Sequence, residues 1–251
     1  MTGGSIMASR AARTRVAVAI VALSSLTLAG PVAASSDHAE YRVTIINLTQ
    51  GQPFTPPLVA LHRRGVDVFT VGQRASFGVK EIAENGNLGP LHDALDETRG
   101  VTAVHQGTEP VVPVGSPGDA MFDSHATFTI ETAQHASRLS WVSMLICTND
   151  GFTGVDSLDL PDRIGQSVVK ATAGYDAGTE RNTERFKDIV GPCQGLTGVG
   201  DGTMHSETSD PTLLTNRVIR HHPGIHGGHD LLIDPHDWTN PVAVIVVTRI
   251  G

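Results

Sequence analysis

Short stretches in which polar and apolar residues alternate, or in which β-branched residues accumulate, dominate this chain. Residues 41–48 begin with such alternation, and residues 126–132 place Phe128 and Ile130 on one face. A period of two puts successive side chains on opposite faces of a β-strand. Further strands are predicted at residues 66–71, 138–146, 168–172, 217–221 and 241–250. Many short strands separated by Gly, Pro and Asp favour an all-β sandwich or barrel.

Two short helices interrupt the strand pattern. Residues 77–83 carry Val79 and Ile82 at helical spacing, and Gly86 is placed to end that helix. Residues 88–95 are predicted to form a further turn or two. Polar, glycine-rich segments are expected to be long loops on the β scaffold, and loops of this length are often functional. They cover residues 150–165, 174–202 and 222–237.

The first residues have the character of a signal peptide. Three arginines precede an apolar stretch at 16–29, and small residues follow at 31–34. The stretch is shorter than the roughly 20 residues that a membrane span needs. We therefore expect residues 1–34 to be removed, leaving one domain at 35–251 that is secreted, periplasmic or held at the cell surface. Arginine greatly outnumbers lysine, which is typical of GC-rich genomes and suggests a bacterial source.

Charge and cysteine content narrow the function. The net charge of −8 becomes −11 once the three arginines of the leader are lost, because the leader holds no acidic residue. Such a protein lacks the basic surface that nucleic-acid binding requires, and no nucleic-acid partner is expected.

Cys147 and Cys193 are the two cysteines, and in an oxidising compartment they are predicted to form a disulfide. Two free buried thiols are the alternative.

Three acidic residues follow the ends of two predicted strands. Asp150 comes after the strand at 138–146, whereas Asp176 and Glu180 come after the strand at 168–172. Calcium takes six to eight oxygen ligands, and adjacent strand ends would bring these carboxylates together. Gly151 and Gly178 would let the backbone curl around such an ion. From spacing alone, however, the signal for a metal is weak, because Asp and Gly in loops usually form turns.

The same residues carry a family resemblance. The segment SMLICTNDGFTGVDSLDLP at 143–161, followed by YDAGTE at 175–180, resembles the signature of the spondin N-terminal domain family. The resemblance implies a C2-like antiparallel β-sandwich with long edge loops, one or two short helices and one Ca²⁺ at its edge. It places the metal ligands at Asp150, Asp176 and Glu180. Two residues depart from the animal pattern, since Gly151 replaces a Trp and Glu180 replaces an Asp.

The expected function is that of an exported, non-enzymatic calcium-binding sandwich that binds an extracellular or cell-surface partner. No catalytic residue is assigned, because the chain has no Gly-x-Ser-x-Gly, His-Glu-x-x-His or P-loop motif.

A histidine-rich segment supports two alternatives. It could serve a secreted metal-dependent hydrolase or a periplasmic transition-metal-binding protein, since imidazole suits zinc, copper and nickel. Its spacing matches no closed structural zinc motif, which favours a polar loop instead. The histidines are His221, His222, His226, His229 and His236. Trp141 and Trp238 are interpreted as core residues rather than ligand platforms.

Overall fold

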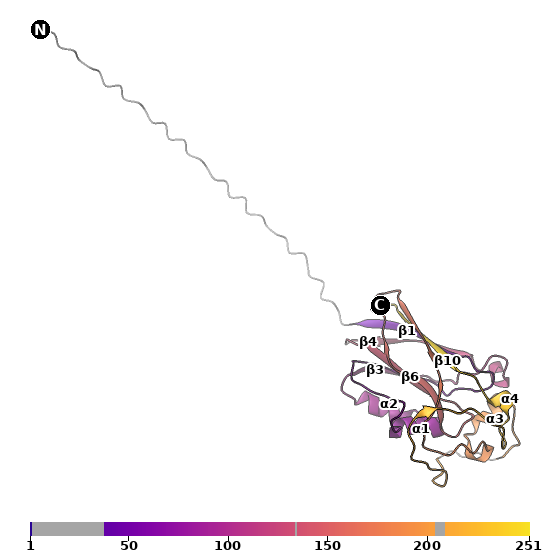
Figure 1. Cartoon of the computed structure of the whole chain (residues 1–251). Coiled ribbons are helices and arrows are strands. Elements are labelled where there is room, and N and C mark those ends of the chain that lie inside the picture. Colours follow the sequence, from indigo (N-terminus) through magenta and orange to yellow (C-terminus); the bar gives the residue numbers. More distant parts are fainter. Residues whose placement is uncertain (2–37, 134, 204–208) are drawn as a thin grey trace. The chain divides into compact units, whose positions relative to one another are not determined.

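The structure, a computed structural model, describes residues 1, 38–133, 135–203 and 209–251. Its strands form two antiparallel sheets (Figure 1). The four-stranded sheet has the order β4 (His125–Thr132), β1 (Ala39–Asn47), β10 (Ala243–Arg249) and β7 (Ser167–Thr172). The six-stranded sheet has the order β3 (Val101–Gln106), β2 (Leu58–His62), β5 (Arg138–Met144), β6 (Gly151–Asp159), β8 (Gly174–Asp176) and β9 (Arg220–His221). The predicted all-β sandwich is confirmed.

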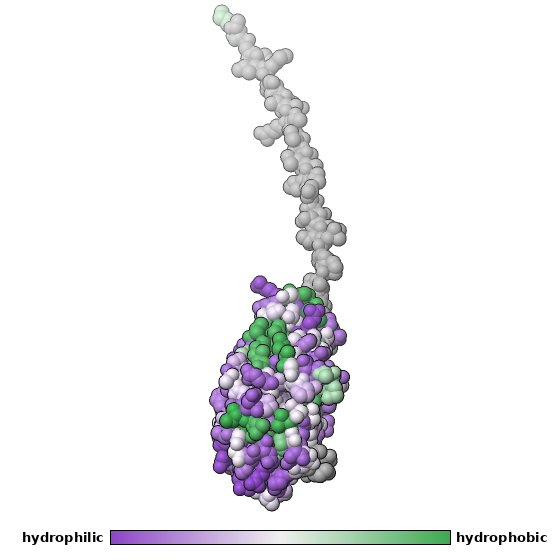
Figure 2. Space-filling model, turned by 90° about the vertical axis from the view of Figure 1, so that its right-hand side faces the viewer, coloured by the Kyte–Doolittle hydropathy of each residue, from purple (hydrophilic) through white to green (hydrophobic). Residues whose placement is uncertain are grey.

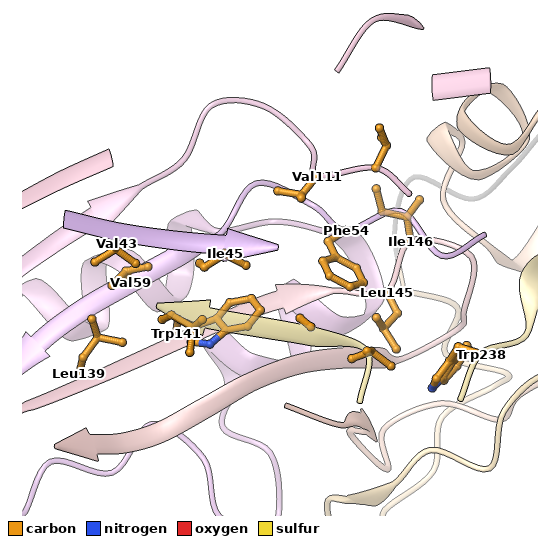
Figure 3. Close-up of a cluster of buried hydrophobic side chains, with 14 of the residues drawn as sticks. Val43, Ile45, Phe54, Val59, Val111, Leu139, Trp141, Leu145, Ile146 and Trp238 are labelled. Atoms are coloured by element: carbon orange, nitrogen blue, oxygen red, sulfur yellow. The ribbon is translucent and has the colours of Figure 1, made fainter. Parts of the chain in front are cut away.

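The main core lies between the two sheets. On β1 every second residue is buried, so that Val43 and Ile45 face the opposite sheet. Val59 on β2 and Trp141 on β5 pack into the same cluster, and Figure 3 shows these side chains between the strands. Trp238 also joins this cluster, so both tryptophans are core residues as predicted.

A second core covers the outer face of the six-stranded sheet. Helices α1 (Phe77–Asn85) and α2 (Gly89–Asp96) bury Val79, Ile82 and Leu91 against Val142 and Met144 of β5. Strand β5 is therefore buried on both faces, which explains why its apolar residues do not alternate regularly with polar ones and why Ser140 and Ser143 are buried as well.

Helix α1 has recognisable ends. The Ser76 hydroxyl accepts a hydrogen bond from the Val79 amide at 3.2 Å, which caps the first turn. Gly86 ends the helix with a φ of 64°, a left-handed conformation that glycine adopts without steric strain. The end predicted from the sequence at Gly86 is confirmed.

Several sequence predictions were wrong. The segment 150–165 is not a loop, because strand β6 occupies much of it. Its Gly154 is required by close packing, since a Cβ there would collide with the Trp141 carbonyl. Residues 66–71 are not a strand; there the Val68 amide bonds to the Asp156 carboxylate at 2.9 Å rather than to a neighbouring strand. The predicted strand 217–221 shrinks to β9, and strands β2, β3 and β8 were missed.

Short helices occupy parts of the predicted loops. These are the 3₁₀ turn η2 (Phe186–Asp188) and the helices α3 (Pro192–Thr197) and α4 (Ile233–His236), whereas the 3₁₀ turn η1 (Pro117–Ala120) lies outside those segments. The predicted disulfide is confirmed, and it joins Cys147, just after β5, to Cys193 in α3. The two cysteines are 46 residues apart in the sequence, and the segment between them contains Asp150, Asp176 and Glu180.

The proposed signal peptide falls almost entirely on residues 2–34, outside the described residues, and stays a prediction. Among the helices that the structure describes, none has the length and apolar character needed to cross a bilayer.

Candidate metal centre

The pairing of β6 with β8 brings the two acidic segments together. Gly151 lies opposite Asp176 in this antiparallel pair, and the Ala177 amide donates to the Asp150 carbonyl at 3.0 Å. The turn after β8 then wraps around the Asp150 side chain. Its Oδ2 accepts hydrogen bonds from the amides of Thr179 at 2.7 Å and Glu180 at 3.0 Å.

Asp150 has one carboxylate oxygen without a partner. The residue is fully buried, and its Oδ1 accepts no hydrogen bond from any described residue. Burial, followed by the negative charge of Asp176, raises the pKa of Asp150 to about 6 despite the two backbone amides that lower it. A buried polar atom without a protein partner is rare in native proteins, and coordination of an ion is one way to satisfy it.

Asp176 is also fully buried, but its oxygens are paired. Oδ1 accepts from the Gly178 amide at 2.8 Å, and Oδ2 accepts from the Asn182 amide group at 3.1 Å and the Arg220 guanidinium at 2.8 Å. Gly178 has a φ of 75°, and a Cβ there would lie 2.8 Å from the Arg217 backbone. The tight turn expected at Gly178 is therefore present.

Gly151 has a different role from the one expected. It lies within β6 and does not have a positive φ. A Cβ at this position would collide with the Thr148 hydroxyl, which accepts the Gly151 amide hydrogen bond at 2.8 Å. Glycine is thus required here by a close approach rather than by a curled backbone.

A fourth carboxylate joins the group from helix α1. Burial, followed by the charge of Glu84, raises the pKa of Glu180 to about 8. Glu84 is 5% exposed, and neither of its oxygens accepts a well-directed hydrogen bond, although the Lys80 ammonium lies 2.9 Å from Oε2. Sequence reasoning missed Glu84. The available signal was its place in the last turn of a helix, where the helix dipole disfavours negative charge.

The charges of this group do not cancel. The raised pKa values of Asp150 and Glu180 show that the group retains protons more readily than free carboxyls do. Full ionisation of the four carboxylates beside two basic partners, Lys80 and Arg220, would leave a net charge of minus two among the described residues. One divalent cation would neutralise it. The carboxylate oxygens stand apart, however: no three of the four side chains, all in the described part of the chain, place an oxygen each within 4.8 Å of the others. Binding an ion would require their side chains to rotate inward.

Comparison with known proteins shows which family this chain is similar to. The family model described as Spondin_N matches residues 47–187, more than half of the chain. The chain belongs to this family. Human spondin-2 is 28% identical over 137 residues, which is 51% of this chain and 39% of spondin-2. The family match includes Glu84, Asp150, Asp176 and Glu180.

The histidines of this Spondin_N domain do not converge. His222 is buried against Trp238, and burial lowers its pKa to about 4. His226 bonds to Glu184 at 3.1 Å, and His221 packs beside Tyr175. Among the described residues, His236 is the one histidine in a group of three ligand-type side chains, and its partners there are the two cysteines rather than histidines. The structure therefore offers no site built from the histidine segment by itself.

The raised pKa values predict how stability depends on pH without added metal. Unfolded carboxyls ionise near pH 4, whereas folded Asp150 and Glu180 hold their protons to about 6 and about 8. The folded state is therefore expected to lose stability from these groups as pH rises from about 4 to about 8.

Urea unfolding of wild type and the Asp150→Asn/Glu180→Gln double variant, in chelator, checks this loss. The stability of the variant relative to wild type should rise across that pH range. The comparison removes the opposite contribution of His222, whose lowered pKa makes the fold more stable as pH rises from about 4. Glu131→Gln, at an exposed carboxylate on β4, should keep the wild-type profile. A constant difference between double variant and wild type would contradict the pKa assignments.

Proposed function

We propose that this chain is an exported, non-enzymatic Spondin_N domain that binds one calcium ion. Asp150, Asp176 and Glu180 supply carboxylate oxygens, and Glu84 supplies a fourth. The observation that carries this proposal is the buried, unpartnered Oδ1 of Asp150 within a group of uncompensated negative charge. A cation is the simplest partner that would satisfy both the oxygen and the charge.

Calcium fits this donor set better than other common ions. The four side chains offer oxygen alone, which suits a hard cation rather than zinc or copper. Calcium accepts six to eight oxygens in flexible geometry, so backbone carbonyls and water can complete the shell. Magnesium requires a near-ideal octahedron at shorter distances, which a site assembled from two loops and a helix meets less readily.

Metal analysis of the purified protein tests the proposal directly. After dialysis against calcium and removal of the excess, one calcium ion per chain should remain, and Asp150→Asn should lose it. Protein that retains no calcium would contradict the proposal. Hydrolysis of a generic ester, peptide, phosphate or glycoside substrate that disappears in His221→Ala or His226→Ala would contradict the non-enzymatic role.

The loop that follows the metal centre is the proposed partner surface. It lines an open pocket of about 390 Å³ that includes Arg181, Arg185 and Lys187. All three side chains are exposed, and Asp188 is the one carboxylate of the lining. Such a cationic pocket is unexpected on a strongly acidic protein. It favours an extracellular partner that carries carboxylate, sulfate or phosphate groups.

The metal centre and this pocket share a segment of chain. Asn182 lines the pocket and also donates to Asp176 in the metal centre at 3.1 Å. Calcium would therefore fix the loop that presents the arginines. Figure 2 shows that hydrophobic patches on the face drawn there are separate and interspersed with hydrophilic residues, so apolar surface on that face does not mark one partner site.

Binding to an immobilised sulfated polysaccharide checks the partner chemistry. Arg181→Glu/Arg185→Glu should abolish binding at low ionic strength, because two attractive charges become repulsive. Arg163→Glu, at an exposed arginine outside the pocket, should retain most of it. Equal binding by both variants would contradict the assignment of this pocket.

A further inference from the structure

A second group of potential metal ligands surrounds the disulfide. Cys147, Cys193 and His236 each place a ligand atom within 4.8 Å of the other two. It is the one such group of three found among the described residues. All three residues are buried, with exposed fractions of 0%, 1% and 0%. They come from the segment just after β5, from α3 and from α4, so the fold, not sequence proximity, assembles them.

The imidazole of His236 has one nitrogen available for a ligand. Its Nδ1 lies 3.0 Å from the Leu232 amide and 3.1 Å from the Leu232 carbonyl, which orients the ring. In the tautomer whose Nδ1–H donates to that carbonyl, Nε2 carries the lone pair that a metal would use. Its Nε2 is buried and has no hydrogen-bond partner among the described residues. Burial lowers the pKa of His236, which favours the neutral form that a metal requires. A fully buried nitrogen without a protein partner is rare, and metal coordination would satisfy it.

The backbone around this group is held independently of the sulfur–sulfur bond. Gln52 is fully buried, and its Nε2 donates to the carbonyls of Cys147 at 3.2 Å and His236 at 2.8 Å. Its Oε1 accepts from the Cys147 amide at 3.1 Å. Phe186 also packs its ring edge near the His236 imidazole. Breaking the disulfide would therefore leave Cys147 and His236 still tied to one side chain.

We propose that reduction of the Cys147–Cys193 disulfide converts this group into a binding site for one soft metal ion, held by the two thiolates and Nε2 of His236. A dithiol is the reductant: it supplies two electrons and two protons, becomes a disulfide, and leaves two cysteine thiols. The metal then displaces those two protons to solvent when it binds the thiolates. The disulfide and the metal are thus mutually exclusive states of the same side chains.

The surroundings favour Cu⁺ over Zn²⁺. Thiolate ligands select both ions, but zinc prefers four ligands and this group supplies three. The three residues are buried, so water has little access to the fourth position. Three-coordinate binding is common for Cu⁺ and needs no further ligand. This site is separate from the carboxylate group, whose oxygens favour a hard cation.

A competition titration with Cu⁺ tests the proposal. The full chain is reduced with dithiothreitol, desalted without oxygen and titrated with Cu⁺ against a chromophoric Cu⁺ chelator. The reduced protein should bind one equivalent and show thiolate-to-copper absorption in the near ultraviolet, whereas the disulfide form should bind none. Zinc, titrated in the same way, should bind more weakly.

Two histidine variants assign the third ligand. His236→Gln should weaken Cu⁺ binding by at least tenfold while the protein stays folded by circular dichroism. His226→Gln, at a more exposed histidine of the same segment, should bind like wild type. The proposal is overturned if His236→Gln binds as tightly as wild type, if the folded reduced protein binds no Cu⁺, or if reduction alone unfolds the chain at 25 °C.

Discussion

Millimolar calcium is expected to raise the melting temperature of this Spondin_N domain, and millimolar magnesium should raise it less. An ion that binds the folded chain and not the unfolded chain stabilises the fold by mass action. At a thousand-fold excess over the dissociation constant, this linkage contributes about 4 kcal/mol. The measurement is thermal unfolding in chelator, in calcium and in magnesium.

Variants of the four carboxylates separate the metal effect from general stability. Asp150→Asn should stabilise the metal-free protein, because it removes a buried charge that Asp176 repels, and should reduce the calcium response. Glu84→Gln should act in the same direction, since Glu84 raises the pKa of both Asp150 and Glu180. Asp176→Asn should lose the calcium response too, but without Arg220 as a full ion-pair partner it should gain less stability.

Glu180→Gln should behave like Asp150→Asn but more mildly, since the longer side chain is expected to coordinate less well. Glu131→Gln provides the matched control, because Glu131 lies on the other sheet and is exposed. It should keep the full calcium response. A wild-type melting temperature that does not respond to millimolar calcium would contradict the site assignment and leave the family membership intact.

Removal of the disulfide should lower the free energy of unfolding by a large amount. The Cys147→Ala/Cys193→Ala variant frees a loop closed over a separation of 46 residues. In the chain-entropy model, such a cross-link stabilises the fold by about 4 kcal/mol. Urea unfolding should show this decrease, and dithiothreitol should lower wild-type stability while leaving the variant unchanged.

The same variant tests whether the disulfide also holds the segment that carries Asp150. Cys147 precedes Asp150 by three residues, and Cys193 ties α3 to that segment. Loss of the bond should therefore weaken calcium binding as well as global stability. A decrease of less than about 1 kcal/mol, which is small beside the chain-entropy value, would show that packing of α3 alone holds the segment.

The sequence predicted best the strands that obey one simple pattern. Strands β1, β4 and β10 lie in the four-stranded sheet, and β1 alternates as the sequence suggested. Strand β2 was missed because all five of its residues are buried, which removes the alternation. Strand β6 was missed because its glycines look like loop residues, whereas close approaches to Thr148 at Gly151 and to the Trp141 carbonyl at Gly154 require them, which no local pattern reveals.

The candidate site also contains some residues that the sequence predicted and others that it missed. The resemblance placed Asp150, Asp176 and Glu180 in one site, and the β6–β8 register does bring their segments together. Glu84 required knowledge of how α1 packs on the sheet, a tertiary contact that helical periodicity does not contain. The pairing of His236 with the disulfide likewise depends on where α4 lies, and the sequence placed this histidine among other histidines instead.

The contribution of α1 to the carboxylate group has a consequence for the outer layer of the molecule. Glu84 lies on a helix that packs against the sheet from outside the sandwich. If all four carboxylates share one ion, local opening of α1 must release a ligand, so the free energy of that opening includes part of the metal-binding energy. Amide hydrogen exchange within α1 would then slow as the calcium concentration rises, which makes this helix a reporter of calcium binding.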